Sequence, residues 1–153
     1  MAKKDDHQAI GKTKTAIVSQ ASGEAVAIIT EIFAQTAPAD SKMRLEFRGP
    51  VKLDDKAFNH IEAVILPIVD QIIQLFGLPI PNFLISISNI GATATIGKGI
   101  KISGFSADLP VFLAMLSSSL QAAMRQDIIA TGHIASLAGD VVPVLDIPLK
   151  IEA

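Results

Sequence analysis

The chain has 153 residues, of which 50% are hydrophobic and 18% charged, as expected for one compact domain with buried strands. Its net charge of −2, the lack of a basic stripe and the absence of tryptophan and tyrosine argue against nucleic-acid binding, and the absence of cysteine excludes disulfides and thiolate chemistry. No apolar run reaches the roughly 18–20 residues that a membrane span needs, so we predict a cytoplasmic protein without a membrane partner.

The first part of the chain predicts strands. Residues 1–13 are polar, too polar for a secretory signal, and we expect a flexible tail before a domain over 14–153. Two runs rich in isoleucine, valine and threonine, Thr15–Val18 and Glu24–Gln35, flank a short turn and predict a β-hairpin. Alternating apolar and polar residues over Met43–Arg48 then predict a half-buried strand.

A long helix is predicted next. Apolar residues recur with helical spacing after Asp54 or Asp55, either of which can cap the helix, and Gly77 is expected to end it. Pro67 falls in the middle of this pattern, and we expect a kink or a break there, because proline lacks a backbone N–H. Period-two alternation over Phe83–Ser88 predicts another strand.

The glycine-rich segment 89–103 is interpreted as a loop or irregular hairpin that leads into a strand at its end. Its glycines Gly91, Gly97 and Gly99 resemble a phosphate-binding loop, but five residues instead of four separate the first two glycines. Gly99 also stands where magnesium binding needs serine or threonine. We therefore predict a flexible loop beside a substrate groove and no nucleotide site.

The last part of the chain predicts a helix, two strands and a final helix. The first helix is expected from Ser106 to about Met124, with Ser103 or Ser106 as its cap. Asp127–Ile134 is interpreted as a buried strand and Val141–Val144 as a second one. Residues 146–148 can start a helix that contains Lys150. No internal repeat is visible, and the predicted fold class is α+β.

Ser106 and Lys150 could form a hydrolytic pair that needs no histidine and no metal. A serine at a helix entrance is most often only a cap, but the free amides there can also stabilise an oxyanion. Gly104 would let the backbone approach a substrate closely. Lys150 follows an apolar run, and burial lowers the pKa of a lysine so that it can act as a base. From the residues alone, both interpretations of Ser106 remain open.

Several short motifs in the second half of the chain are informative through their order. They follow one another as Gly104-Phe105-Ser106-Ala107, Thr131-Gly132-His133, Gly139 with Val141-Val142-Pro143, and Lys150. In this order, and nearly in this spacing, they resemble the proteolytic domain of Lon proteases, the Ser-Lys peptidases of the AAA+ class, and most closely its divergent Lon-related members. Residues 15–103 match that domain only loosely.

The resemblance implies a serine endopeptidase in which Ser106 is the nucleophile, Lys150 the general base and Thr131 the hydrogen-bond partner of the lysine. Backbone amides near Phe105–Ala107, beside Gly104, would hold the oxyanion. It also implies a Lon-type, ribosomal-protein-like β-α-β arrangement, here incomplete at the C-terminus, and a homo-oligomer, hexameric in the family. The expected substrate is a peptide or unfolded protein, with ATP only on a separate AAA+ segment and no cofactor or metal in this domain.

The chain also departs from the family pattern. Phe105 replaces a proline, Asp108 a glycine, Ser103 an aspartate and His133 a glutamate, and residues 145–146 replace a pair of glycines. These departures motivate an alternative function, a catalytically silent Lon-like module for oligomerisation or substrate docking.

The remaining charged and imidazole side chains suggest structural roles. Asp108 would favour the dipole of the helix that it begins. A lone histidine in an apolar strand, such as His133, is more often a hydrogen-bonded core residue than a base, and it is kept here only as a supporting residue. His7 and His60 have no companions at metal-ligand spacing, so the sequence predicts no metal site.

Overall fold

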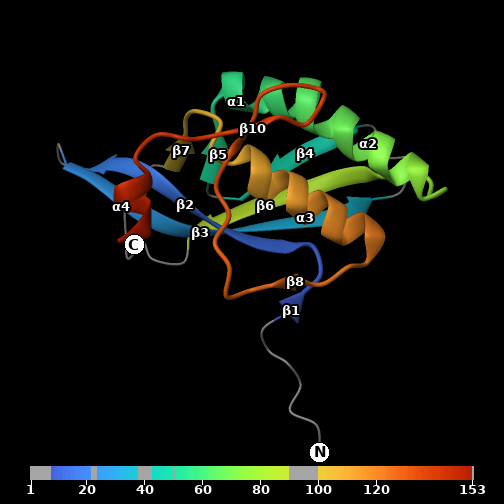
Figure 1. Ribbon diagram of the computed structural model, residues 1–153, viewed down its shortest axis with the longest axis horizontal. Coiled ribbons are helices and arrows are strands. Elements are labelled where there is room, and N and C mark those ends of the chain that lie inside the picture. Colours follow the sequence, from blue (N-terminus) through green and yellow to red (C-terminus); the bar gives the residue numbers. More distant parts are fainter. Residues whose placement is uncertain (1–7, 22–23, 38–42, 50, 90–99, 153) are drawn as a thin grey trace, which may run out of the picture.

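A mixed four-stranded sheet forms the centre of the molecule, shown in Figure 1 as a computed structural model that describes residues 8–21, 24–37, 43–49, 51–89 and 100–152. Its strand order is β2 (Lys12–Ala21), β3 (Glu24–Ala37), β6 (Asn82–Asn89) and β4 (Leu45–Arg48). β3 runs antiparallel to both β2 and β6, whereas β4 runs parallel to β6. Together with its helices this sheet gives the predicted α+β class.

The register of the sheet follows from which side chains are apolar. Along β6 the side chains of Phe83, Ile85 and Ile87 are buried, while those between them are only half-buried. Ile32 and Ala34 on β3 are buried directly opposite Ile87 and Ile85. A slip of one residue would turn all of these side chains to the other face, so the alternation fixes the pairing.

The helices pack on this sheet and on one another. Figure 1 shows α3 (Asp108–Leu120) lying across the strands, and α3 contacts β2, β3 and α2 (Leu66–Leu75). The apolar side chains of Val111, Ala114 and Met115 are fully buried in this layer. Among the helices of the described residues, none combines the length and apolar character that crossing a bilayer requires.

The interruption predicted at Pro67 takes the form of a π-helical turn. α1 (Asp55–His60) is followed by η1 (Ile61–Ile65), and α2 then continues the same rod. The N–H of Leu66 donates to the carbonyl of Ile61, five residues earlier. Because proline has no N–H and its ring collides with the carbonyl four residues back, a wider turn just before Pro67 relieves the clash.

Both ends of this helical rod are as predicted. The Asp54 carboxylate accepts a hydrogen bond of 2.7 Å from the N–H of Ala57, so Asp54 is the cap. At the other end Gly77 has a positive φ of 67°, a conformation that glycine adopts without strain.

The start of the domain was predicted too late. Residues 8–13 were assigned to a flexible tail, but β1 (Gln8–Ala9) pairs with β8 (Met124–Arg125), and β2 begins at Lys12. Gly11 lies between β1 and β2, and its N–H donates a hydrogen bond of 2.8 Å to the hydroxyl of Ser117 on α3. The polar composition of this stretch did not predict strands, because these strands are held by contacts with residues far along the chain. Residues 1–7 lie outside the described part.

One short strand pair flanks the glycine-rich segment. β5 (Val51–Leu53), which was not predicted, pairs in parallel with β7 (Ile100–Ile102), where a strand was expected. The hairpin turn at 22–23 and the loop at 91–99, for which we predicted flexibility and no nucleotide site, fall outside the described residues.

The predicted buried strand Asp127–Ile134 is wrong. Only β9 (His133–Ile134) is a strand, paired with β10 (Val141–Val142), and Ile129 makes a single bridge to Lys14. The side chains of Ile128 and Ile129 are about half exposed, at 54% and 47%. A β-branched run favours an extended chain, but it becomes a buried strand only where neighbours cover it.

The helices of this region also differ from the prediction in their ends. α3 begins at Asp108 with Ala107 as its N-cap and without a side-chain cap, so neither Ser103 nor Ser106 caps it. It ends at Leu120, before the predicted Met124, because Gln121 adopts a left-handed conformation. The final helix, α4 (Ile147–Ile151), contains Lys150 as predicted.

Candidate functional site

Ser106 lies in a tight turn immediately before α3. The turn is closed by a hydrogen bond of 3.1 Å from the N–H of Asp108 to the carbonyl of Phe105. Gly104 enters it with a φ of 82°, which other residues adopt only with strain. Ser106 itself is half-buried, and the backbone N–H groups of Ser106 and Ala107 make no hydrogen bond to another described residue. Two free amides therefore lie beside the serine.

The segment 131–132 packs directly against this turn. The N–H of Gly132 donates to the carbonyl of Ser106 over 3.3 Å, and the N–H of Leu109 donates to the carbonyl of Gly132 over 3.2 Å. A Cβ atom on Gly132 would lie 3.1 Å from Cδ2 of Leu109, so a larger residue would push the two segments apart. The hydroxyl of Thr131 adds a longer contact of 3.4 Å to the same Ser106 carbonyl.

Lys150 reaches this place from α4. Its Nζ donates a hydrogen bond of 3.2 Å to Oγ1 of Thr131, and only 9% of the residue is exposed. Burial lowers the pKa of Lys150, and the attraction of Asp146 opposes that change only in part. The structure thus brings together Ser106, Thr131 and Lys150, which we call the dyad cluster.

Within the dyad cluster the hydroxyl of Ser106 and the amine of Lys150 are not directly hydrogen-bonded. Among the hydrogen bonds of the described residues, none joins Oγ of Ser106 to Nζ of Lys150, and the connection runs through Thr131. Catalytic hydrogen bonds often tighten only when a substrate is bound.

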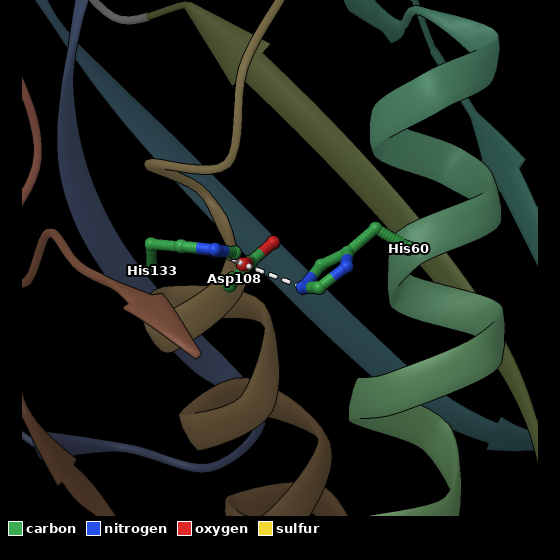
Figure 2. A group of neighbouring side chains, drawn as sticks. All are labelled: His60, Asp108 and His133. Carbon is green, nitrogen blue, oxygen red and sulfur yellow. Dashed lines mark hydrogen bonds and ion pairs between the residues drawn. The ribbon is translucent and has the colours of Figure 1, made fainter. Parts of the chain in front are cut away.

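A second group of polar side chains involves Asp108, the residue that follows this turn. Figure 2 shows the carboxylate of Asp108 between the imidazoles of His133 and His60. Oδ2 of Asp108 is 2.7 Å from Nδ1 of His133 and 3.2 Å from Nε2 of His60, and it also accepts a hydrogen bond of 3.2 Å from the N–H of Ile134. We call His60, Asp108 and His133 the histidine cluster.

The histidine cluster corrects two predictions. Asp108 does begin α3, but it is only 1% exposed and does more than favour the helix dipole. His60 was predicted to have no companions, yet its ring at the end of α1 lies beside both other members. His133 is hydrogen-bonded and half-buried, as a core histidine would be, and its partner is Asp108.

Phe105 covers this cluster. Its ring stacks on His133 with centroids 4.6 Å apart and packs at the same distance, but tilted, on His60. Nζ of Lys56 lies over the Phe105 ring, 5.6 Å from its centroid. Phe105 is therefore the lid of the histidine cluster.

Burial raises the pKa of the Asp108 carboxyl. The hydrogen bond from His133 and the charges of both imidazoles act in the opposite direction without overcoming this effect. Oδ1 of Asp108 is buried and has no hydrogen-bond partner among the described residues, so one half of the carboxylate is unsatisfied.

Sequence reasoning missed this cluster because its members come from α1, the start of α3 and β9. One signal could have pointed to it: an acidic residue directly followed by the apolar run of a buried helix needs partners. No protein-family model matches the chain, and no curated protein matches it in sequence. Its chemistry has to be inferred from its own geometry.

Proposed function

We propose that this chain is a Lon-like serine endopeptidase domain in which Ser106 is the nucleophile and Lys150 the general base. The observation that supports this most is the hydrogen bond from the buried Nζ of Lys150 to Thr131, whose hydroxyl reaches the Ser106 carbonyl. These are the three residues that the resemblance assigns to the catalytic group. The substrate would be a peptide or unfolded protein.

The reaction would proceed in two steps. Neutral Lys150 accepts the proton of the Ser106 hydroxyl as Oγ attacks the scissile carbonyl carbon. The resulting ammonium returns that proton to the leaving amine, the C–N bond breaks, and an acyl-enzyme ester remains. Water, deprotonated by Lys150, then attacks the ester and releases the carboxylic acid product while Ser106 regains its proton.

The surroundings support each role. Burial lowers the pKa of Lys150, which increases the fraction of neutral amine available as a base. The hydrogen bond to Thr131 fixes the position of Nζ beside the serine turn. The unbonded N–H groups of Ser106 and Ala107, before the start of α3, would donate to the oxyanion.

The test is cleavage of a fluorescently labelled unfolded protein by the full chain and its variants. Ser106→Ala should reduce turnover by at least about 1,000-fold, and Lys150→Met by about 100- to 10,000-fold. Lys52→Met is the matched control for the lysine, because Lys52 is exposed and lies outside the site, and it should stay within about twofold. Circular dichroism checks that each variant is folded.

Two results would contradict the proposal. Turnover by Ser106→Ala equal to that of the unaltered protein would exclude this nucleophile. A complete lack of cleavage by the unaltered protein would favour the second candidate instead.

The second candidate is a silent Lon-like module for substrate docking or oligomerisation. It is favoured by the fact that, among the hydrogen bonds of the described residues, none joins the Ser106 hydroxyl to the Lys150 amine. In that case the unaltered protein and Ser106→Ala would bind an unfolded peptide equally well by fluorescence anisotropy, or assemble equally by light scattering, without any cleavage.

A further inference from the structure

The histidine cluster brings three possible ligand atoms close together, and one of them, Nε2 of His60, also lies 2.9 Å from the carbonyl oxygen of Ile134. Nε2 of His60, Oδ2 of Asp108 and Nδ1 of His133 all lie within 4.8 Å of one another. The two distances that involve Asp108 are 3.2 Å and 2.7 Å. Ligands at tetrahedral angles around zinc, with bonds of about 2.0–2.1 Å, are about 3.3 Å apart. The contacts of Oδ2 with the two nitrogens are within about 0.6 Å of that spacing, whereas the two imidazole nitrogens, up to 4.8 Å apart, would have to approach each other by up to about 1.5 Å.

The carboxylate has capacity that the protein leaves unused. Asp108 is 1% exposed, and its Oδ1 has no partner among the described residues. A buried carboxylate oxygen without a partner is costly. A metal ion bound at Oδ2 would neutralise the charge of this buried carboxylate, which the two imidazoles contact only through Oδ2.

The three ligands stand on separate, firmly packed elements. His60 ends α1, Asp108 opens α3 and His133 belongs to β9. Phe105 packs on both imidazole rings and limits their rotation. The imidazole side chains are 16% and 21% exposed, so an ion from solution can reach their edges. Sites held in this way keep their geometry better than sites on loops.

From this geometry we propose that His60, Asp108 and His133 bind a divalent transition-metal ion of the zinc class, with water in the remaining position. Two imidazoles and one carboxylate are a donor set that suits zinc, and three protein ligands leave one position open. The ion would tie α1 and β9 to the turn that carries Ser106. Because neither Ser106 nor Lys150 supplies a ligand, this inference does not depend on the proposed peptidase activity.

The experiment is a zinc titration of the full chain, freed of metal with a chelator and followed by isothermal titration calorimetry. We expect one ion per chain. Asp108→Asn and His133→Gln, which preserve side-chain size, should each weaken zinc binding by more than about 100-fold. His7→Gln is the matched control, because it removes the remaining histidine of the sequence and should leave the affinity unchanged.

Cobalt(II) provides an independent readout. Its visible absorption bands should show a four- or five-coordinate site in the unaltered protein and in His7→Gln, and should be lost in His133→Gln. Should Asp108→Asn fail to fold by circular dichroism, His60→Gln takes its place. Absence of zinc binding, or an affinity unchanged in the cluster variants, would overturn the proposal and leave the cluster as a hydrogen-bonded structural network.

Discussion

The dyad cluster and the histidine cluster share the same two backbone segments but are held together very differently. Ser106 and Asp108 lie two residues apart on one segment, and Thr131 and His133 lie two residues apart on the other. The dyad cluster is joined by contacts of 3.2 and 3.4 Å, whereas the histidine cluster includes a shorter contact of 2.7 Å between Asp108 and His133. The shortest contact at this turn thus belongs to the histidine cluster.

The largest expected effect concerns stability. Asp108→Ala leaves the imidazole of His133 and the N–H of Ile134 without their acceptor and removes the carboxylate beside His60, and it should lower the free energy of unfolding by about 3 kcal/mol. Thr131→Val, which removes only longer contacts, should cost about 1 kcal/mol. Urea unfolding followed by circular dichroism measures both changes. Equal losses of unfolding free energy would show that the two clusters contribute equally to stability.

A smaller effect should appear in catalysis. Thr131→Val keeps the side-chain shape but removes the acceptor of the Lys150 hydrogen bond, and should lower kcat by about 10- to 100-fold through misplacement of the amine. KM should hardly change, and Thr131→Ser should restore most of the rate. A loss that appears only in KM would assign Thr131 to substrate binding rather than to positioning of the lysine.

The pH dependence of turnover has a defined sign. The base is neutral Lys150, so turnover should rise about tenfold per pH unit below the pKa of this lysine and level off above it. Because burial lowers that pKa, the inflection should lie below the ordinary lysine value. Asp146 raises the pKa of Lys150, so Asp146→Asn should shift the inflection to lower pH and increase turnover at neutral pH.

The same pKa shift affects folding. Between the lowered pKa of folded Lys150 and the ordinary pKa of the unfolded chain, the unfolded state binds more protons, so stability contributed by this group should increase with pH. α4 packs on β2 and β3. On these strands the charged side chains of Lys12, Lys14 and Glu31 alternate with the buried threonines Thr13, Thr15 and Thr30, so the charged side chains point away from the sheet face that α4 covers. Thermal unfolding of Lys150→Met, which has no such group, should lack this slope.

The smallest expected effect tests the lid. Phe105→Leu removes aromatic contacts with His60 and His133 and should cost about 1 kcal/mol of stability. Proton chemical shifts of both imidazole rings should change as the ring current disappears. Unchanged shifts would mean that Phe105 does not cover the histidines in solution.

The parts of the fold that the sequence predicts are those with local patterns. Alternation predicted β6 and β4, helical spacing and Asp54 predicted the α1–α2 rod, and the proline predicted its interruption. β5 and the short β1 could not be predicted, because two or three residues carry no periodicity and the strands exist only through distant partners. The strand predicted over 127–134 was wrong for the same reason. The composition of a segment can be read from the segment itself, whereas its burial depends on residues far away in the sequence.

The candidate site divides in the same way. Ser106, Thr131 and Lys150 could be selected because a resemblance supplied their order along the chain. The histidine cluster follows no short spacing, and His60, at the end of α1, reaches Asp108 because η1 and α2, which continue the same rod, pack on α3. A histidine judged alone in the sequence can therefore have close partners in the fold.

The π-helical turn η1 sets the direction in which His60 points. A turn with one extra residue rotates everything before it by about 100° relative to an uninterrupted α-helix. The faces of α1 and α2 are consequently out of phase by that angle, and α2 is fixed by its buried Val69 and Ile73. Deleting one residue from η1, such as the exposed Ala63, would turn α1 by about 100° relative to α2 and move the imidazole of His60 away from Asp108. The histidine cluster thus depends on the one extra residue that η1 contains, and not only on which residues occupy these positions.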